Sequence, residues 1–298
     1  MPQTVGLTYG NAVATLSTLG AEPVAWSVAG RDLLWTGDPA YWARVSPVLF
    51  PTVGRVRGGE LRVEGRTYPM EIHGFAPASE FSVAERSAEA VRFVLEDNQE
   101  TRRRYPFAFR LEVAYRLRER VLVTEFRVVN PGERPLPFAL GFHPGFRWPF
   151  GGSGRAGYVI EFEQAEDAAV PVITKDGLFS SERRQVPLQG RKLPLDETVL
   201  AREALCFLGA RSKHVRLVSP GEGAIRMSAE NFSHWALWGR AGAPFVCIEA
   251  WTGHGDPDGF TGDIMEKPSM RFLAPGADSR HRRSEEHTSE LQSQSNLV

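Results

Sequence analysis

The sequence lacks most of the features that assign a protein to a class directly. Its 298 residues include only two cysteines, too few for a disulfide framework, and its net charge of −1 gives no electrostatic footprint for nucleic acid. No apolar run is long enough to span a membrane, and no basic stretch followed by an apolar one marks an N-terminal signal peptide. We therefore expect a cytoplasmic protein that binds neither nucleic acid nor a membrane.

The two cysteines, Cys206 and Cys247, lie within the apolar runs 205–207 and 246–248. Free cysteine is among the most buried residue types. Because nothing else in the sequence indicates secretion, we expect two reduced core residues rather than a disulfide.

What the sequence has instead is a succession of short alternating runs. Apolar and charged residues alternate over 109–117 and again over 121–129, with a turn of three residues between them, which is typical of a half-buried hairpin. Many of the 29 glycines and 21 prolines separate further runs of this kind, and helical patterns are confined to 38–44 and 196–204. The sequence predicts an all-β fold, a sandwich or a barrel, as a single domain over residues 1–282. The other expected strands are 5–9, 12–17, 24–28, 32–35, 61–63, 66–68, 81–85, 90–95, 158–162, 214–219, 225–229, 235–238 and 245–249.

Residues 283–298 differ from the rest of the chain. This segment is polar, shows no apolar alternation and resembles the translation of a sequencing-library adapter. We expect it to be a non-native, disordered tail that takes no part in the fold.

Two of the seven histidines are candidates for acid–base chemistry, since imidazole titrates near neutral pH. His73 directly precedes Gly74, and His143 lies in the segment FALGFHPGF, residues 138–146. Each follows a strand and has aromatic and small turn residues beside it, a position that suits a functional site and a structural histidine equally well. His254, in the glycine-rich loop 252–256, either lines a site or shapes the loop.

Glu249 places a carboxylate inside the apolar run 244–251. Burying a carboxylate is costly unless it is paired or used, and apolar surroundings raise its pKa toward the range of a general base. A salt bridge to an arginine explains it equally well. Arg55 presents a fork of donors suited to sugar hydroxyls, carboxylates or phosphates, and Trp251 offers an apolar face on which a pyranose ring can stack.

Four segments in this order resemble the aldose 1-epimerase (galactose mutarotase) family, and its LacX-like branch most. They are FPTVGR at 50–55, HGFA at 73–76, PFALGFHPGF at 137–146 and PFVCIEAW at 244–251. Tyr105-Pro-Phe107 and Thr261-Gly-Asp263 add to the resemblance, which runs from about Gly6 to about Pro275. The combination is far more specific than any one segment.

The resemblance implies a large antiparallel β-sandwich of the galactose mutarotase type. It implies an isomerase that interconverts the α and β anomers of a hexose and needs no cofactor or metal. In this reading Glu249 is the catalytic base and His143 the catalytic acid, while His73 and Arg55 bind the sugar. Glu203 stands where the family has an aspartate or asparagine.

Three alternatives stay open. A hexose 6-phosphate substrate would use Arg55, its neighbour Arg57 or the cluster 102–104 to receive the phosphate. A non-catalytic sugar-binding or sugar-sensing protein would keep the fold but would have no need of the acid/base pair. A metal-dependent enzyme would use His73, His143 and His254, whose spacing matches no metal motif. The expected partner is a small-molecule sugar, and the chain is expected to be a monomer or a homodimer.

Overall fold

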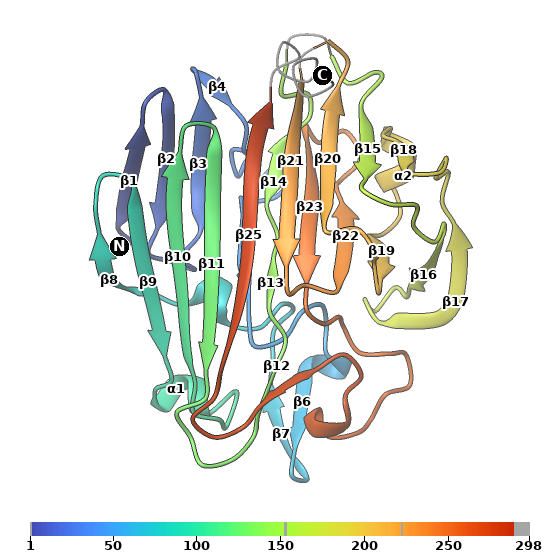
Figure 1. The fold of residues 1–298 in the computed structure, drawn as a ribbon. Coiled ribbons are helices and arrows are strands. Elements are labelled where there is room, and N and C mark those ends of the chain that lie inside the picture. Colours follow the sequence, from blue (N-terminus) through green and yellow to red (C-terminus); the bar gives the residue numbers. More distant parts are fainter. Residues whose placement is uncertain (1, 152–153, 222, 289–298) are drawn as a thin grey trace.

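A computed structural model describes residues 2–151, 154–221 and 223–288 of the chain. Its main feature is a nine-stranded antiparallel sheet in the order β18-β15-β20-β21-β25-β11-β10-β9-β8. Behind it in Figure 1 lie a four-stranded sheet, β1-β2-β3-β4, and a sheet of order β19-β22-β23-β13-β5 in which β14 also pairs with β23. The expected all-β sandwich is confirmed.

The nine-stranded sheet contains β8 (Ser82–Arg86), β9 (Ala90–Glu96), β10 (Arg110–Arg118), β11 (Val121–Val129), β15 (Val159–Phe162), β18 (Lys192–Pro194), β20 (His214–Ser219), β21 (Gly223–Glu230) and β25 (Asp278–Thr288). The four-stranded sheet contains β1 (Thr4–Tyr9), β2 (Ala12–Ser17), β3 (Pro23–Val28) and β4 (Arg31–Asp32). The third contains β5 (Val48–Leu49), β13 (Gly141–Phe142), β14 (Gly145–Arg147), β19 (Leu205–Leu208), β22 (His234–Trp238) and β23 (Phe245–Trp251). The remaining strands pair in twos: β6 (Glu60–Val63) with β7 (Arg66–Pro69), β12 (Leu136–Phe138) with β24 (Arg271–Leu273), and β16 (Ala169–Ile173) with β17 (Phe179–Gln185).

The predicted strands recur in the structure almost throughout. β10 and β11 pair in register from Arg110↔Val129 to Arg118↔Val121, which confirms the central hairpin. The run 32–35 is the exception, because strand β4 is confined to Arg31–Asp32.

Of the two predicted helices, one is present only as a single turn and the other is absent. The segment 196–204 contains a single turn, α2 (Glu197–Leu200), capped by the Asp196 side chain. The segment 38–44 is not helical. It makes one turn, in which the N–H groups of Tyr41 and Trp42 donate to the Asp38 carbonyl oxygen at 3.0 and 2.8 Å. Directly after the segment, the N–H groups of Val45 (2.6 Å) and Ser46 (2.8 Å) donate to the Glu22 carboxylate. A further short helix, α1 (Gln99–Arg102), was not predicted from the sequence. It begins with a capping box at Asn98.

The expectation of a disordered tail from residue 283 is wrong for residues 283–288. They form the second half of β25, which pairs with β11 on one side and β21 on the other in the middle of the nine-stranded sheet (Figure 1). Backbone hydrogen bonding does not depend on side-chain type, so a polar segment can complete a sheet whose neighbours leave a place for it. Residues 289–298 lie outside the described residues.

An aromatic cluster anchors the segment that leads to Arg55. The Phe50 ring lies 5.1 Å from Phe109 and 6.2 Å from Phe75, centroid to centroid, and all three side chains are buried. Burying a phenylalanine stabilises a fold by roughly 1.5–3 kcal/mol. Both cysteines are buried and free, as expected. In the described part of the chain, no helix is long and apolar enough to cross a membrane.

Candidate active site

One cleft brings together all six residues that the sequence singled out for a site. It has a volume of about 820 Å³ and takes its lining from β5, β16, β17, β19, β22 and β23 and the loops beside them. Its lining includes Arg55, His73, His143, Glu203, Glu249 and Trp251.

Strand register places His143 and Glu249 face to face. Phe142 pairs with Ala250 and Gly145 with Cys247, so the two residues between β13 and β14 pass opposite Ile248 and Glu249. His143 is therefore the cross-strand neighbour of Glu249, and such neighbours have their Cβ atoms about 5 Å apart. The pairing of these strands therefore brings together two residues that are far apart in the sequence.

The two side chains meet at the bottom of the cleft. His143 Nε2 lies 3.3 Å from Glu249 Oε1, and the side chains are 8% and 1% exposed. Trp251 donates its indole N–H to the other carboxylate oxygen, Glu249 Oε2, at 2.9 Å. The carboxylate is thus held by the indole on one side and faces the imidazole on the other.

Burial shifts both pKa values toward the neutral forms. It raises the pKa of Glu249 well above its ordinary value, although the Trp251 N–H and the Arg283 charge oppose this. It also lowers the pKa of His143 well below the ordinary value, and His73 and Arg283 lower that pKa further. Both shifts favour the uncharged state, carboxyl with imidazole. It differs from carboxylate with imidazolium only in the position of one proton, which either partner can carry.

Aromatic rings that the sequence analysis missed enclose His143. The Trp42 ring lies 4.9 Å from the imidazole at an interplanar angle of 30°, and Trp238 meets it edge-on at 5.6 Å. Both tryptophans line the cleft. Trp42 lies in the segment read as a helix, and Trp238 ends a strand whose aromatic residues are typical of a core, so neither gave a signal of its own.

His73 is held in an unusual backbone conformation. Its φ is +68°, and it is followed by Gly74 at +76°. The Gly54 N–H donates to His73 Nδ1 at 3.1 Å, so in the neutral ring the proton sits on Nε2. Burial lowers the pKa of His73 to about 4, with a further contribution from Arg55, and the imidazole is therefore neutral at pH 7. It can donate a hydrogen bond from Nε2 but cannot serve as a cation.

Arg55 and Glu203 line the same cleft but differ in whether another side chain pairs with them. Among the described residues, no side chain forms an ion pair or hydrogen bond with the exposed Arg55 guanidinium. Glu203 is already paired, with Arg184 Nε 2.6 Å from its Oε1. Trp251 is only 4% exposed and uses its N–H on Glu249, so the structure gives it a role in holding the carboxylate, and sugar stacking on it stays a prediction.

His254 lies apart from the pair and shapes its loop. Its Nδ1 lies 2.8 Å from the Gly255 carbonyl oxygen, and its ring packs on Phe179 with centroids 4.8 Å apart. No three His, Cys, Asp or Glu side chains in the described ranges are arranged to hold a metal ion. The metal-site alternative built on His73, His143 and His254 therefore finds no support in the geometry.

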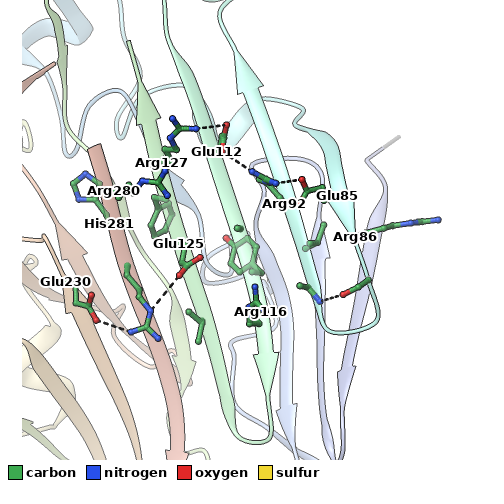
Figure 2. A pocket seen from close by; sticks show the side chains of 18 of the residues that line it. Glu85, Arg86, Arg92, Glu112, Arg116, Glu125, Arg127, Glu230, Arg280 and His281 are labelled. Carbon is green, nitrogen blue, oxygen red and sulfur yellow. Dashed lines mark hydrogen bonds and ion pairs between the residues drawn. The ribbon is translucent and has the colours of Figure 1, made fainter. Parts of the chain in front are cut away.

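A second cavity, of about 670 Å³, lies on the nine-stranded sheet and has a different character. Figure 2 shows arginine and glutamate side chains of neighbouring strands facing one another across it, with Glu112 between Arg92 (3.5 Å) and Arg127 (3.7 Å). Burial alone would raise the pKa of Glu112, but Arg110, Arg127 and Arg92 outweigh it and lower the pKa. The Glu112 carboxylate at the centre of this cavity already forms ion pairs with arginines. It therefore does not form an acid/base pair comparable with Glu249 and His143.

Comparisons with known proteins agree with the geometry. The family model described as aldose 1-epimerase matches residues 3–254. The chain is 30% identical over 258 residues to the chromosomal LacX protein of Lactococcus lactis, covering 83% of this chain and 86% of that protein. It also resembles two solved structures with a TM-score of 0.88 each: a galactose mutarotase-like protein of Lactobacillus casei (27% identity, 96% of this chain and 100% of that one) and a galactose mutarotase related enzyme of Lactobacillus acidophilus (28%, 96% and 98%). The galactose mutarotase-like sandwich is thereby confirmed, and the chain belongs to the aldose 1-epimerase family.

Proposed function

We propose that this protein is an aldose 1-epimerase in which Glu249 and His143 are the acid/base pair. The observation that supports it most is the 3.3 Å separation of His143 Nε2 and Glu249 Oε1 at the bottom of an open cleft. In a pyranose, the hydroxyl oxygen that loses a proton and the ring oxygen that gains one are bonded to the same carbon. A base and an acid in contact with each other match that arrangement.

The chemistry then needs only proton transfer. Glu249 as carboxylate removes the proton of the C1 hydroxyl while His143 as imidazolium protonates the ring oxygen, and the C1–O bond to the ring oxygen breaks. The free aldehyde rotates about the C1–C2 bond and the ring closes on the other face, with the two protons returned. Positioned groups of this kind contribute roughly 10²–10⁴-fold each.

The other cleft residues suit sugar binding. Neutral His73 donates from Nε2, and Arg55 has a guanidinium available for ring hydroxyls. These two residues are therefore expected to affect sugar affinity more than proton transfer.

A phosphorylated hexose is a second candidate substrate, favoured by the charge of the cleft. Arg202 and Arg240 line it and are exposed, and no carboxylate of the described residues pairs with either. Of the other two suggested phosphate ligands, Arg57 pairs with Asp258 at 3.4 Å, and the cluster 102–104 lies outside the lining. Faster conversion of glucose 6-phosphate than of glucose, lost on changing Arg202 and Arg240 to Gln, would establish this alternative.

Polarimetry of freshly dissolved α-D-glucose and α-D-galactose tests the main proposal. We expect the protein to speed relaxation to the same final rotation, and Glu249→Gln or His143→Ala to lower kcat by at least about 100-fold. Glu112→Gln, which changes a mostly buried carboxylate in the other cavity, is the control and should keep its kcat. Full activity in either cleft variant would contradict the assignment. Sugar binding without acceleration in the unmodified protein would favour the non-catalytic alternative.

A further inference from the structure

The Arg55 guanidinium is positioned by its backbone rather than by its side-chain neighbours. Since no described side chain bonds to it, its location depends on where two backbone segments lie: the segment from Gly54 to Arg57, and Gly177, whose added Cβ would lie 2.9 Å from Arg55 Nε. The segment from Gly54 to Arg57 packs directly on the loop that follows β23. A Cβ added to Gly54 would lie 2.7 Å from the Gly255 nitrogen, so the two backbones are in contact.

Asp256 bonds to this segment at two points, directly after Arg55 and on both sides of Val56. Its backbone N–H donates to the Arg55 carbonyl oxygen at 2.9 Å, and its carboxylate oxygen Oδ2 accepts the Arg57 N–H at 2.8 Å. Its own carbonyl oxygen accepts the N–H of Phe179, another lining residue, at 2.9 Å. One residue therefore joins the Arg55 segment to the β16–β17 hairpin across one wall of the cleft.

A buried lysine completes the arrangement. Lys267 Nζ lies 2.5 Å from Asp256 Oδ1, and the two side chains are 1% and 4% exposed. A buried ion pair is weak evidence for stability, since an apolar replacement is often as stable, but it can fix one local geometry. Here the ammonium occupies Oδ1, which leaves Oδ2 directed at the Arg57 N–H.

We propose that Asp256, held by Lys267, is a positioning residue for Arg55 and thereby sets the affinity of the cleft for its sugar. The proposal rests on the proposed function, because Arg55 is taken to bind substrate. It concerns neither Glu249 nor His143, which lie on other segments. A change at Asp256 should therefore alter sugar binding and KM while leaving kcat and its pH dependence in place.

The test compares two double variants that both lack the buried charges. Asp256→Asn with Lys267→Met keeps a side-chain oxygen for the Arg57 N–H, whereas Asp256→Ala with Lys267→Met removes it. Losing one such hydrogen bond should raise KM, and the Kd of the sugar, about five- to tenfold in the Ala variant relative to the Asn variant. The kcat values should agree within about twofold, as expected where chemistry is untouched. Binding of glucose and galactose is followed by the fluorescence of the cleft tryptophans Trp42 and Trp238.

A double-mutant cycle with Arg55→Ala separates positioning from general damage. If Asp256 acts through Arg55, the difference between the Asn and Ala variants disappears in the Arg55→Ala background. The inference would be overturned if the difference persisted in the Arg55→Ala background, or if the two double variants had equal Kd values. The proposed function would still stand in that case, provided that the unmodified protein is active. An unmodified protein that neither binds nor converts either sugar would instead overturn the proposed function, and this inference with it.

Discussion

Gly74 fixes where the His73 imidazole lies. A Cβ on this glycine would approach the Phe50 carbonyl oxygen to 2.2 Å, and its φ is +76°. The turn brings the His73 backbone against the segment of Phe50 to Gly54, where His73 N–H donates to the Gly54 carbonyl oxygen at 2.9 Å. A side chain at position 74 would collide with the Phe50 carbonyl, and the positive φ also disfavours residues other than glycine. Glycine is therefore required for both reasons.

We expect Gly74→Ala to destabilise the protein by more than about 3 kcal/mol, since strain and backbone clash add, and to weaken sugar binding. Gly30→Ala is the matched control. Gly30 has nearly the same φ, +78°, but no atom of the described residues lies within 4 Å of its added Cβ, so only the left-handed strain of about 1–2 kcal/mol should apply. Urea unfolding of both variants measures the difference, and equal losses would show that the close approach does not matter.

At the residue scale, sequence reasoning found what is chemically out of place. A carboxylate in an apolar strand pointed to Glu249, and imidazoles at strand ends pointed to His143 and His73. It missed Trp42 and Trp238, because an aromatic residue in a β protein is usually core and only the tertiary fold turns these two toward His143. The pairing of Arg57 with Asp258 was equally invisible, since loops far apart in sequence meet there.

At the element scale, most of the longer alternating strands were predicted, whereas β25, the β16–β17 hairpin and several short strands were not. The inward-facing positions of the second half of β25 carry Arg283, Glu285 and His287, all buried. The alternation rule looks for apolar residues at such positions, so the run was read as a tail. The short helix α1 was missed for another reason: a single capped turn is too short to show a helical period.

The buried pair in β25 is expected to cost stability. Arg283 Nε lies 2.6 Å from Glu285 Oε1, and the Arg283 guanidinium also donates to the carbonyl oxygens of Phe142 and Ile248. Taking both charges out of water costs several kcal/mol per ion, which the ion pair and the two hydrogen bonds to carbonyl oxygens recover only in part.

Replacing both Arg283 and Glu285 with Leu should therefore raise the free energy of unfolding by about 1–4 kcal/mol. Arg282→Leu with Glu286→Leu makes the same change of composition on the outward face of the same strand. Because Arg282 is 43% exposed and forms surface ion pairs, this control should change stability by less than about 1 kcal/mol. Thermal unfolding of the two variants gives the comparison, and a destabilised inner pair would contradict the argument.

At the scale of the whole molecule, buried titratable groups set how stability changes with pH. Burial is the largest cause that lowers the pKa values of His73, His234 and His281 to about 4, and it raises that of Glu285 to about 7. The shifts of Glu249 and His143 have opposite senses, so their effects on the pH dependence oppose each other. These pKa shifts cannot be deduced from the net charge of −1, because they depend on which titratable groups the fold buries.

The sign follows from proton uptake on unfolding. A histidine whose folded pKa is depressed contributes stability above its unfolded pKa of about 6.5 and loses it as pH falls toward 4. A glutamate whose folded pKa is raised contributes fully below about 4.5 and loses its contribution as pH rises toward 7. Between pH 5 and 6, unfolding thus takes up a proton at each of three histidines and releases one at Glu285. This gives a net uptake of at least about two protons, to which His214, His254 and His287 add because their pKa values are lowered as well. Stability should therefore rise by at least about 2–3 kcal/mol per pH unit, and the rise should level off near pH 7.

Urea unfolding at pH 5, 6 and 7 measures this slope. His234→Asn tests its origin, because the Asn oxygen can replace His234 Nδ1 as acceptor of the Gly209 N–H, a bond of 2.9 Å in the folded protein. The variant loses one of the titrating imidazoles, so its slope should be lower by about 1.4 kcal/mol per pH unit. Stability that falls between pH 5 and 6, or a slope that the substitution leaves unchanged, would mean that these histidines are not held neutral by the fold.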